Sequence, residues 1–169
     1  MLNIRRRIRQ KWRLHLCGAV FAVLFALAGA RARAATLIWS GLGGDSNIST
    51  AANWLPLQAP AAGDALVFGG GTRLAPQLTA NLSVGSITFN ATAGAFVVGG
   101  SATFSIDSGG ITNSDAGAQT INAAIKLTAD QTWNAAAGDL AIGGAIDKNN
   151  QALTIDGSFN TALSGAVSG

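Results

Sequence analysis

The chain has 169 residues, enough for one ordinary domain, and its formal net charge of +3 is unevenly distributed. Eight of the 11 basic residues precede position 35, whereas all eight acidic residues, every one an aspartate, follow it. The part after position 35 is therefore acidic. This argues against nucleic acid as a partner, because such binding needs clustered Lys and Arg.

After position 34 the sequence contains no His, Cys, Glu, Tyr or Met. This composition excludes thiol nucleophiles, thiolate metal sites and disulfides, and it leaves Ser and Thr without a general base. The aspartates are scattered about one per expected turn. We therefore predict no catalytic residue, no cofactor and no metal. A β-helix enzyme that cleaves polysaccharides stays as a remote alternative, because two carboxylates can carry out that chemistry.

Residues 1–34 have the three parts of a signal peptide. A basic stretch reaches Arg13, an apolar stretch covers 14–30, and overlapping Ala-x-Ala cleavage frames end at Ala30, Ala32 and Ala34. We favour cleavage between Ala34 and Ala35. An uncleaved anchor is the alternative, but the apolar stretch is shorter than the roughly 20 residues that a membrane-spanning helix needs. The leader predicts export, by the general secretory route or, as the alternative, the twin-arginine route.

Residues 35–76 are expected to form an N-terminal cap segment, because they hold all three prolines and the tryptophans Trp39 and Trp54. These indoles have two interpretations. They could fill the end of the core, which we favour, or they could stack on sugar rings as ligand-binding residues. The second interpretation makes a carbohydrate-binding module the alternative function.

Residues 77–169 contain short apolar stretches that alternate with polar residues, the pattern of strands with one buried face. The longest alternation places Ile121, Ala123, Ile125 and Leu127 on one face. Apolar pairs recur at spacings of 13 to 21 residues, close to one turn of a β-solenoid. The expected fold is all-β: a right-handed parallel β-helix or solenoid after an N-terminal cap and a signal-peptide helix. A β-sandwich is the alternative.

Two kinds of loop imitate ligand motifs. The run Gly41 to Gly44 lacks the third Gly of a dinucleotide motif and the Gly-Lys pair of a phosphate loop. The segments that begin at Asp45 and Asp147 place oxygen-bearing side chains at alternate positions, as a calcium loop does. The Asp147 segment lacks the Gly and Glu of such a loop, and the Asp45 segment is a similarly incomplete match. We interpret all three as turns.

The chain resembles the autotransporter-associated β-strand repeat proteins, which are large exported bacterial proteins. The resemblance covers most of residues 36–169. It rests on a set of short segments: Trp39-Ser40-Gly41, Ser49-Thr50-Ala51-Ala52-Asn53-Trp54, Pro60, Gly63-Asp64, Leu66-Val67-Phe68-Gly69-Gly70, Ser86-Ile87-Thr88-Phe89, Gly110-Ile111-Thr112-Asn113, Gln119-Thr120-Ile121-Asn122 and Ala129-Asp130-Gln131-Thr132-Trp133-Asn134. Ile48 departs from the pattern, since related sequences often have another Trp there.

This resemblance implies a parallel β-helix passenger at or outside the cell surface, and it brings no catalytic residues. The expected function is adhesion or display by an exported structural passenger, secreted, at the cell surface, or in the outer membrane or periplasm. Its expected partners are surface glycans or proteins of a host or cell envelope. Membrane contact is expected only through the signal peptide or a C-terminal barrel of a longer protein, because the repeat array predicts that this chain is an N-terminal fragment.

Overall fold

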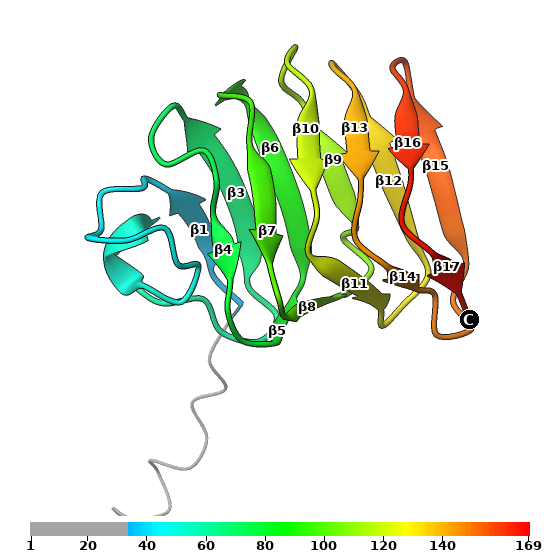
Figure 1. The fold of residues 1–169 in the computed structure, drawn as a ribbon, viewed down its shortest axis with the longest axis horizontal. Coiled ribbons are helices and arrows are strands. Elements are labelled where there is room, and N and C mark those ends of the chain that lie inside the picture. Colours follow the sequence, from blue (N-terminus) through cyan, green and yellow to red (C-terminus); the bar gives the residue numbers. More distant parts are fainter. Residues whose placement is uncertain (1–33) are drawn as a thin grey trace, which may run out of the picture. The chain divides into compact units, whose positions relative to one another are not determined.

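Residues 34–169 are described by a computed structural model and contain 17 β-strands and one short 3-10 helix, η1 (Ala51–Asn53) (Figure 1). The basic and apolar parts of the expected signal peptide, and with them its expected helix, lie outside the described residues. Of the favoured cleavage site, both Ala34 and Ala35 are described.

The strands form three sheets. Sheet A has seven strands: β1 (Thr36–Trp39), β2 (Trp54–Leu55), β3 (Ala65–Gly70), β6 (Ser86–Ala93), β9 (Ile111–Asn113), β12 (Gln131–Ala135) and β15 (Leu153–Gly157). Sheet B has five: β4 (Gln77–Leu78), β7 (Val97–Gly100), β10 (Gln119–Ile121), β13 (Leu140–Ile142) and β16 (Thr161–Leu163). Sheet C also has five: β5 (Leu82–Val84), β8 (Thr103–Ile106), β11 (Ala124–Leu127), β14 (Ile146–Asp147) and β17 (Val167–Ser168).

The chain visits the sheets in the fixed order A, B, C, and each round makes one coil. Five coils follow one another from β3–β4–β5 to β15–β16–β17, stacked side by side in Figure 1. Strands of successive coils pair in parallel on all three sheets, and among the named strands only β1 and β2 pair antiparallel. The predicted β-solenoid is therefore confirmed. The β-sandwich alternative is wrong, because its sheets would be built largely from antiparallel neighbours.

One coil is longer than most of the apolar spacings suggested. Ile111 lies beside Trp133 and Trp133 beside Ile155, so each of these turns on sheet A takes 22 residues. The earlier turns, from Phe68 to Phe89 and from Ile87 to Ile111, take 21 and 24 residues. Most of the recurring apolar pairs belong to different sheets, so the distances between them are only parts of a coil. The exception is Phe104 and Ile125, which are direct neighbours in sheet C and 21 residues apart.

The longest predicted alternation keeps its buried face but is not one strand. Ile121 ends β10 in sheet B, and β11 in sheet C begins at Ala124. Ile121, Ala123, Ile125 and Leu127 are all buried. The chain turns a corner between the two strands without changing which alternate residues point inward, so a period of two continues across two sheets.

The core is a set of columns that run along the solenoid. The inward column of sheet A contains Leu66, Ile87, Ile111 and Trp133, all fully buried. Near the cap the core is aromatic, and Phe68 stacks on Phe89 with ring centroids 5.4 Å apart. Each coil therefore buries its apolar residues against the next coil, as expected for a repeat architecture.

At the N-terminal end, the cap contacts the first coil on all three sheets. On sheet A, β1 and β2 continue the sheet beyond β3. On sheet B, the Gln77 N–H donates to the Ser46 carbonyl at 2.8 Å. On sheet C, the Gly63 N–H donates to the Ser83 carbonyl at 3.2 Å. The cap thus occupies backbone groups of the first coil on each sheet, and the edge of sheet A that remains is the two-residue strand β2; a very short edge strand is a poor template for pairing with other chains. The first coil already begins at Ala65, inside the segment expected to be the cap.

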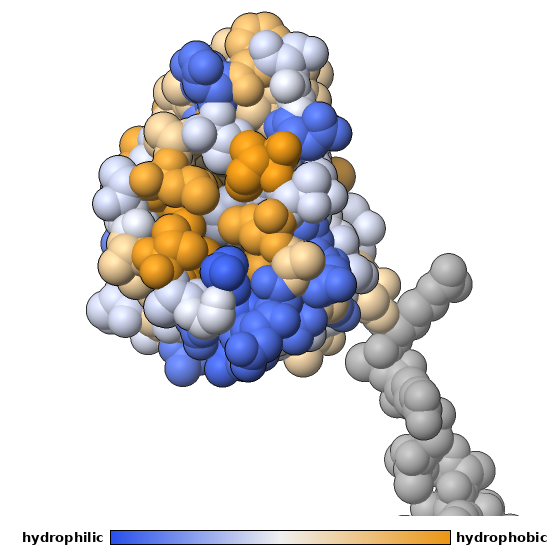
Figure 2. Space-filling view, turned by 90° about the vertical axis from the view of Figure 1, so that its right-hand side faces the viewer, coloured by the Kyte–Doolittle hydropathy of each residue, from blue (hydrophilic) through white to orange (hydrophobic). Residues whose placement is uncertain are grey.

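The face of the fifth coil that points away from the fourth is open within the described residues, and it carries an apolar patch beside hydrophilic side chains (Figure 2). Its exposed apolar side chains include Ile155 (45% exposed) and Val167 (49%). The residues in register with them in the fourth coil, Trp133 and Ile146, are at most 1% exposed. The comparison shows that burial at these positions depends on the coil stacked above.

Candidate interaction surface

The outer face of sheet A carries one column of side chains that crosses all seven strands in register. We call it the central column, and it contains Leu55, Ile38, Val67, Thr88, Thr112, Asn134 and Asp156. Neighbouring strands in a sheet lie about 4.8 Å apart, so the side chains of the column repeat at that interval. The column therefore runs in register across the whole sheet.

The chemistry of the central column changes along its length. Ile38 and Leu55, at the cap end, are 43% and 48% exposed although they are apolar. Thr88 and Thr112 follow in the middle and are half-buried. Asp156 ends the column on an exposed position of the fifth coil. The surface therefore offers apolar contact at one end and hydrogen-bonding groups at the other.

Further hydroxyl groups lie beside the central column. Thr132 and Thr154 are exposed and directly paired between β12 and β15. Ser86, on β6, belongs to the same outer face. Hydroxyl groups both donate and accept hydrogen bonds, so this face can satisfy many polar partners without charge. Such contacts are individually weak and gain strength only when many of them form together.

Trp39 and Trp54, the candidate ligand-stacking residues, lie inside the cap. They are 1% and 0% exposed, and their rings meet edge to face with centroids 5.1 Å apart. The Trp39 indole N–H donates to the Thr72 carbonyl at 3.1 Å, and the Trp54 indole N–H donates to the Ile48 carbonyl at 2.7 Å. Neither ring presents a face to a ligand in this structure. They fill the end of the core, as large aromatic residues usually do.

Ile48 stands where related sequences often have another Trp. It is 1% exposed and takes part in this packing. Its carbonyl accepts the Trp54 indole, and its N–H donates to the Gln77 carbonyl at 3.0 Å. The apolar side chain and both backbone groups are therefore used, and the cap closes without a third tryptophan.

The loop that contains Gly41 to Gly44 and Asp45 is organised around a buried amide. Asn53 accepts the Gly43 N–H at 2.8 Å and donates to the carbonyls of Asp45 and Asn47. The Asp45 carboxylate accepts the backbone N–H of Asn47 at 2.9 Å and the Thr50 hydroxyl at 3.0 Å. These bonds, that of the Asn47 backbone first, hold the pKa of Asp45 below its ordinary value. The segment is a hydrogen-bonded turn.

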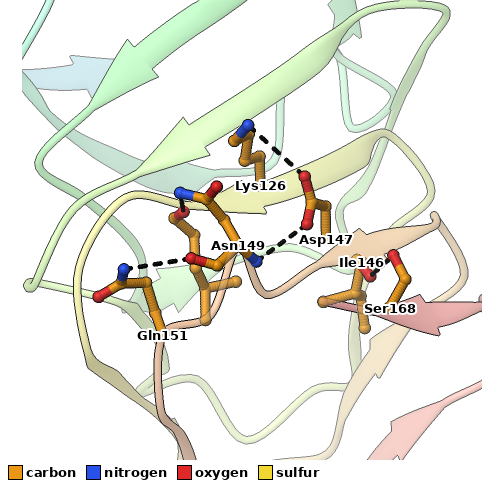
Figure 3. Close-up of polar contacts among 7 residues, drawn as sticks. Lys126, Ile146, Asp147, Asn149, Gln151 and Ser168 are labelled. Atoms are coloured by element: carbon orange, nitrogen blue, oxygen red, sulfur yellow. Dashed lines mark hydrogen bonds and ion pairs between the residues drawn. The ribbon is translucent and has the colours of Figure 1, made fainter.

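The segment that begins at Asp147 is likewise a turn (Figure 3). Asp147 accepts the Asn149 N–H at 2.9 Å and pairs with Lys126 at 3.6 Å. Asn149 and Asn150 have φ of 51° and 59°, a left-handed conformation that Asn tolerates. The Asn149 side chain donates to the Leu127 carbonyl of the preceding coil at 3.2 Å. The side chains that imitate a calcium loop therefore serve turn geometry and coil stacking.

Polar side chains that connect successive coils form a pattern that the sequence alone did not suggest. The carboxylates of Asp130 and Asp139 accept the N–H groups of Ala152 and Asn160, at 2.8 and 3.0 Å. Acceptor and donor are 22 and 21 residues apart, one coil in each case. Two of the scattered aspartates that we expected in turns thus bind backbone donors of the next coil. Among residues 34–169, no group of three or more potential metal-ligating side chains occurs.

The chain was compared with known protein families, with characterised proteins and with solved structures, and none of these comparisons finds a match. Between residues 34 and 169, no helix is long and apolar enough to cross a membrane.

Proposed function

We propose that this chain is an exported, non-catalytic β-solenoid that presents the outer face of sheet A for adhesion or display. The observation that carries the proposal is the central column, seven side chains in register across sheet A. Repetition at a fixed interval suits partners that also repeat, such as surface glycans or proteins of a host or cell envelope. The leader in residues 1–34 supports export.

The proposal extends to the family. A passenger of the autotransporter-associated β-strand repeat type is supported by the short segments quoted above and is consistent with the solenoid fold. In such a protein the coils act as a rigid rod, and the exposed polar rows make contact. Stacked coils suit this role because each coil adds further contact groups without disturbing the others.

Beads that carry many copies of the purified protein test the surface. We expect such beads to adhere to epithelial or bacterial cells more than beads coated with albumin. Thr112→Lys places a long charged side chain in the middle of the central column, and we expect it to lower bead retention at least tenfold because weak contacts add up across the surface.

The matched control is Ser105→Lys on sheet C. Ser105 is also half-buried and lies on an outer column, in register with Lys126. Equal loss of adhesion in the two variants would show that added charge, and not the place of the central column, matters. Adhesion no greater than that of albumin-coated beads would refute the proposed function.

A further inference from the structure

Asp64 is a buried carboxylate at the point where the cap meets the first coil. Only 2% of the residue is exposed. One carboxylate oxygen accepts the Ala35 N–H at 2.7 Å, and the other accepts the Ala61 N–H at 2.8 Å. Both partners are neutral backbone groups.

Burial of a carboxylate is costly unless a cation accompanies it. Among residues 34–169 the one ion pair joins Lys126 to Asp147, and the Arg73 side chain donates to the Gly41 carbonyl at 3.0 Å. The described part of the chain therefore supplies Asp64 with no cationic side chain. The group nearest its Oδ1 in hydrogen-bond geometry is the backbone nitrogen of Ala35.

The same nitrogen becomes a cation under one condition. Hydrolysis of the peptide bond between Ala34 and Ala35 by a leader peptidase consumes one water, leaves a carboxylate on Ala34 and turns the Ala35 nitrogen into an ammonium group. Of the three Ala-x-Ala frames, only the one that ends at Ala34 gives this result. Cleavage after Ala30 or Ala32 would leave the new terminus four or two residues earlier.

We propose that Asp64 is the receptor for the N-terminal ammonium group of the processed chain. The ammonium keeps the position that the Ala35 N–H already has, so no rearrangement is needed to form the ion pair. Ala35 precedes β1, and its carbonyl accepts the Ala65 N–H at 2.8 Å. The ion pair would thus fasten the start of β1 to the start of the first coil.

This inference rests on the export that is part of the proposed function, and the first experiment separates the two. The full 169-residue chain is expressed in a bacterial host, and the N-terminal sequence and intact mass of the secreted form are determined. We expect the sequence to begin at Ala35. A secreted form that begins at Arg31 or Arg33 overturns the ion pair and leaves export intact. If the chain is never exported, both the ion pair and the proposed function are overturned.

The second experiment measures the ion pair itself by a double-mutant cycle. The secreted form that begins at Ala35 is compared with a form that retains Ala34, in which the Ala35 nitrogen is again a neutral amide. Each is studied with Asp64 and with Asp64→Asn. We expect the added Ala34 to raise the equilibrium constant for unfolding at least tenfold with Asp64 present, and much less with Asp64→Asn.

The control is Asp107→Asn, which changes an exposed turn carboxylate and should leave the effect of Ala34 unchanged. If Asp64→Asn fails to fold, the comparison of the two N-termini with Asp64 in place still decides, because both keep the hydrogen bond from the Ala35 nitrogen to Asp64 and differ in whether that nitrogen or the one of Ala34 carries the N-terminal charge. Equal stability of those two forms overturns the proposal.

Discussion

Buried amide side chains hold the corners of the coils together. Gln119 is fully buried; its oxygen accepts the Phe96 N–H at 2.9 Å and its nitrogen donates to the Gly94 carbonyl at 3.0 Å. Gln131 accepts the Trp133 indole N–H at 2.9 Å and donates to the Ile106 carbonyl at 3.0 Å. Gln119 satisfies two backbone groups of the preceding coil, and Gln131 adds a second donor to the Ile106 carbonyl, which also accepts the Thr128 N–H at 2.9 Å. The core therefore tolerates polar residues because each is fully bonded.

Gln119→Met tests this role at one residue. Methionine keeps the length of the side chain and removes the amide, so the Phe96 N–H and the Gly94 carbonyl lose their partner inside the core. Unsatisfied buried groups cost about 1–3 kcal/mol each, so we expect the free energy of unfolding to fall by roughly 2–4 kcal/mol in urea titrations. The control is Thr120→Ala, at the neighbouring position on the outer face of the same strand. It should change the free energy of unfolding by less than about 0.5 kcal/mol. A near-neutral Gln119→Met would show that the corner relaxes or admits water.

Asp45 gives the cap a dependence on pH. Its folded-state pKa lies below the ordinary value of 3.8, mainly because the charged form accepts the Asn47 backbone N–H. The stabilisation is therefore complete above pH 3.8 and is lost as the pH falls through the folded-state pKa. We expect the carboxyl carbon of Asp45 to titrate below pH 3.8 in NMR spectra. We also expect Asp45→Asn to weaken the dependence of the thermal midpoint on pH in that window. A carboxyl midpoint above 3.8 would contradict the hydrogen-bond pattern.

At the scale of elements, the corners decide how closely coils stack. The corner between sheets B and C contains Ala123, Gly144 and Gly165 at equivalent places in successive coils. A Cβ on Gly144 would collide with the Ala123 carbonyl, and one on Gly165 would collide with the Gly144 carbonyl. The backbones of neighbouring coils are thus in direct contact there, which only a residue without a side chain allows.

Gly144→Ala should therefore push the fourth coil away from the third. We expect a loss of about 1–3 kcal/mol in the free energy of unfolding, the usual range for overpacking. Gly44→Ala provides the matched control, because a Cβ at Gly44 meets nothing within 4 Å. The control should be neutral or slightly stabilising, since alanine restricts the unfolded chain. Similar chemical denaturation curves for the two variants would show that the corner is not tightly packed.

Several elements could be predicted from the sequence, and the reasons for the misses are physical. Alternation identified the inward residues of β8, where Phe104 and Ile106 are buried, because a period of two survives in any sheet. Alternation carries no information about which sheet a strand joins, so the corner after Ile121 could not be predicted. For the same reason, most of the spacings between apolar pairs did not give the length of a coil. Aspartates that bind the next coil, such as Asp139, look like ordinary turn residues until the coil length is known.

The interaction surface was less predictable than the fold. The sequence indicated outward Thr and Asn side chains in general terms, but the register that aligns Thr88, Thr112 and Asn134 comes only from the pairing of strands one coil apart. The apolar end of the central column was not predicted, because Ile38 and Leu55 belong to the cap, where no repeat sets the phase. Trp39 and Trp54 had two interpretations in the sequence, and their burial depends on contacts between distant segments.

At the scale of the whole molecule, the stability of each coil depends on its neighbours. Contacts in a solenoid are made between adjacent coils, so a coil with a neighbour on each side is held more firmly than a coil with one. The first coil has the cap on one side and the second coil on the other. The fifth coil has the fourth on one side and, within the described residues, an open apolar face on the other.

The rate of amide hydrogen exchange should therefore increase along the solenoid axis from the third coil to the fifth. Backbone N–H groups of β9, in the third coil, can exchange only when several coils separate, whereas those of β15 are released when the fifth coil alone detaches. We expect exchange in β15 to be at least tenfold faster than in β9 at neutral pH, with β12 between them. The strand β3 serves as the internal control, because it lies near the other end of the solenoid but is covered by β1, and it should remain protected. Equal exchange rates in β15 and β9 would mean that the coils unfold as one unit and that nearest-neighbour stacking does not govern the stability of this molecule.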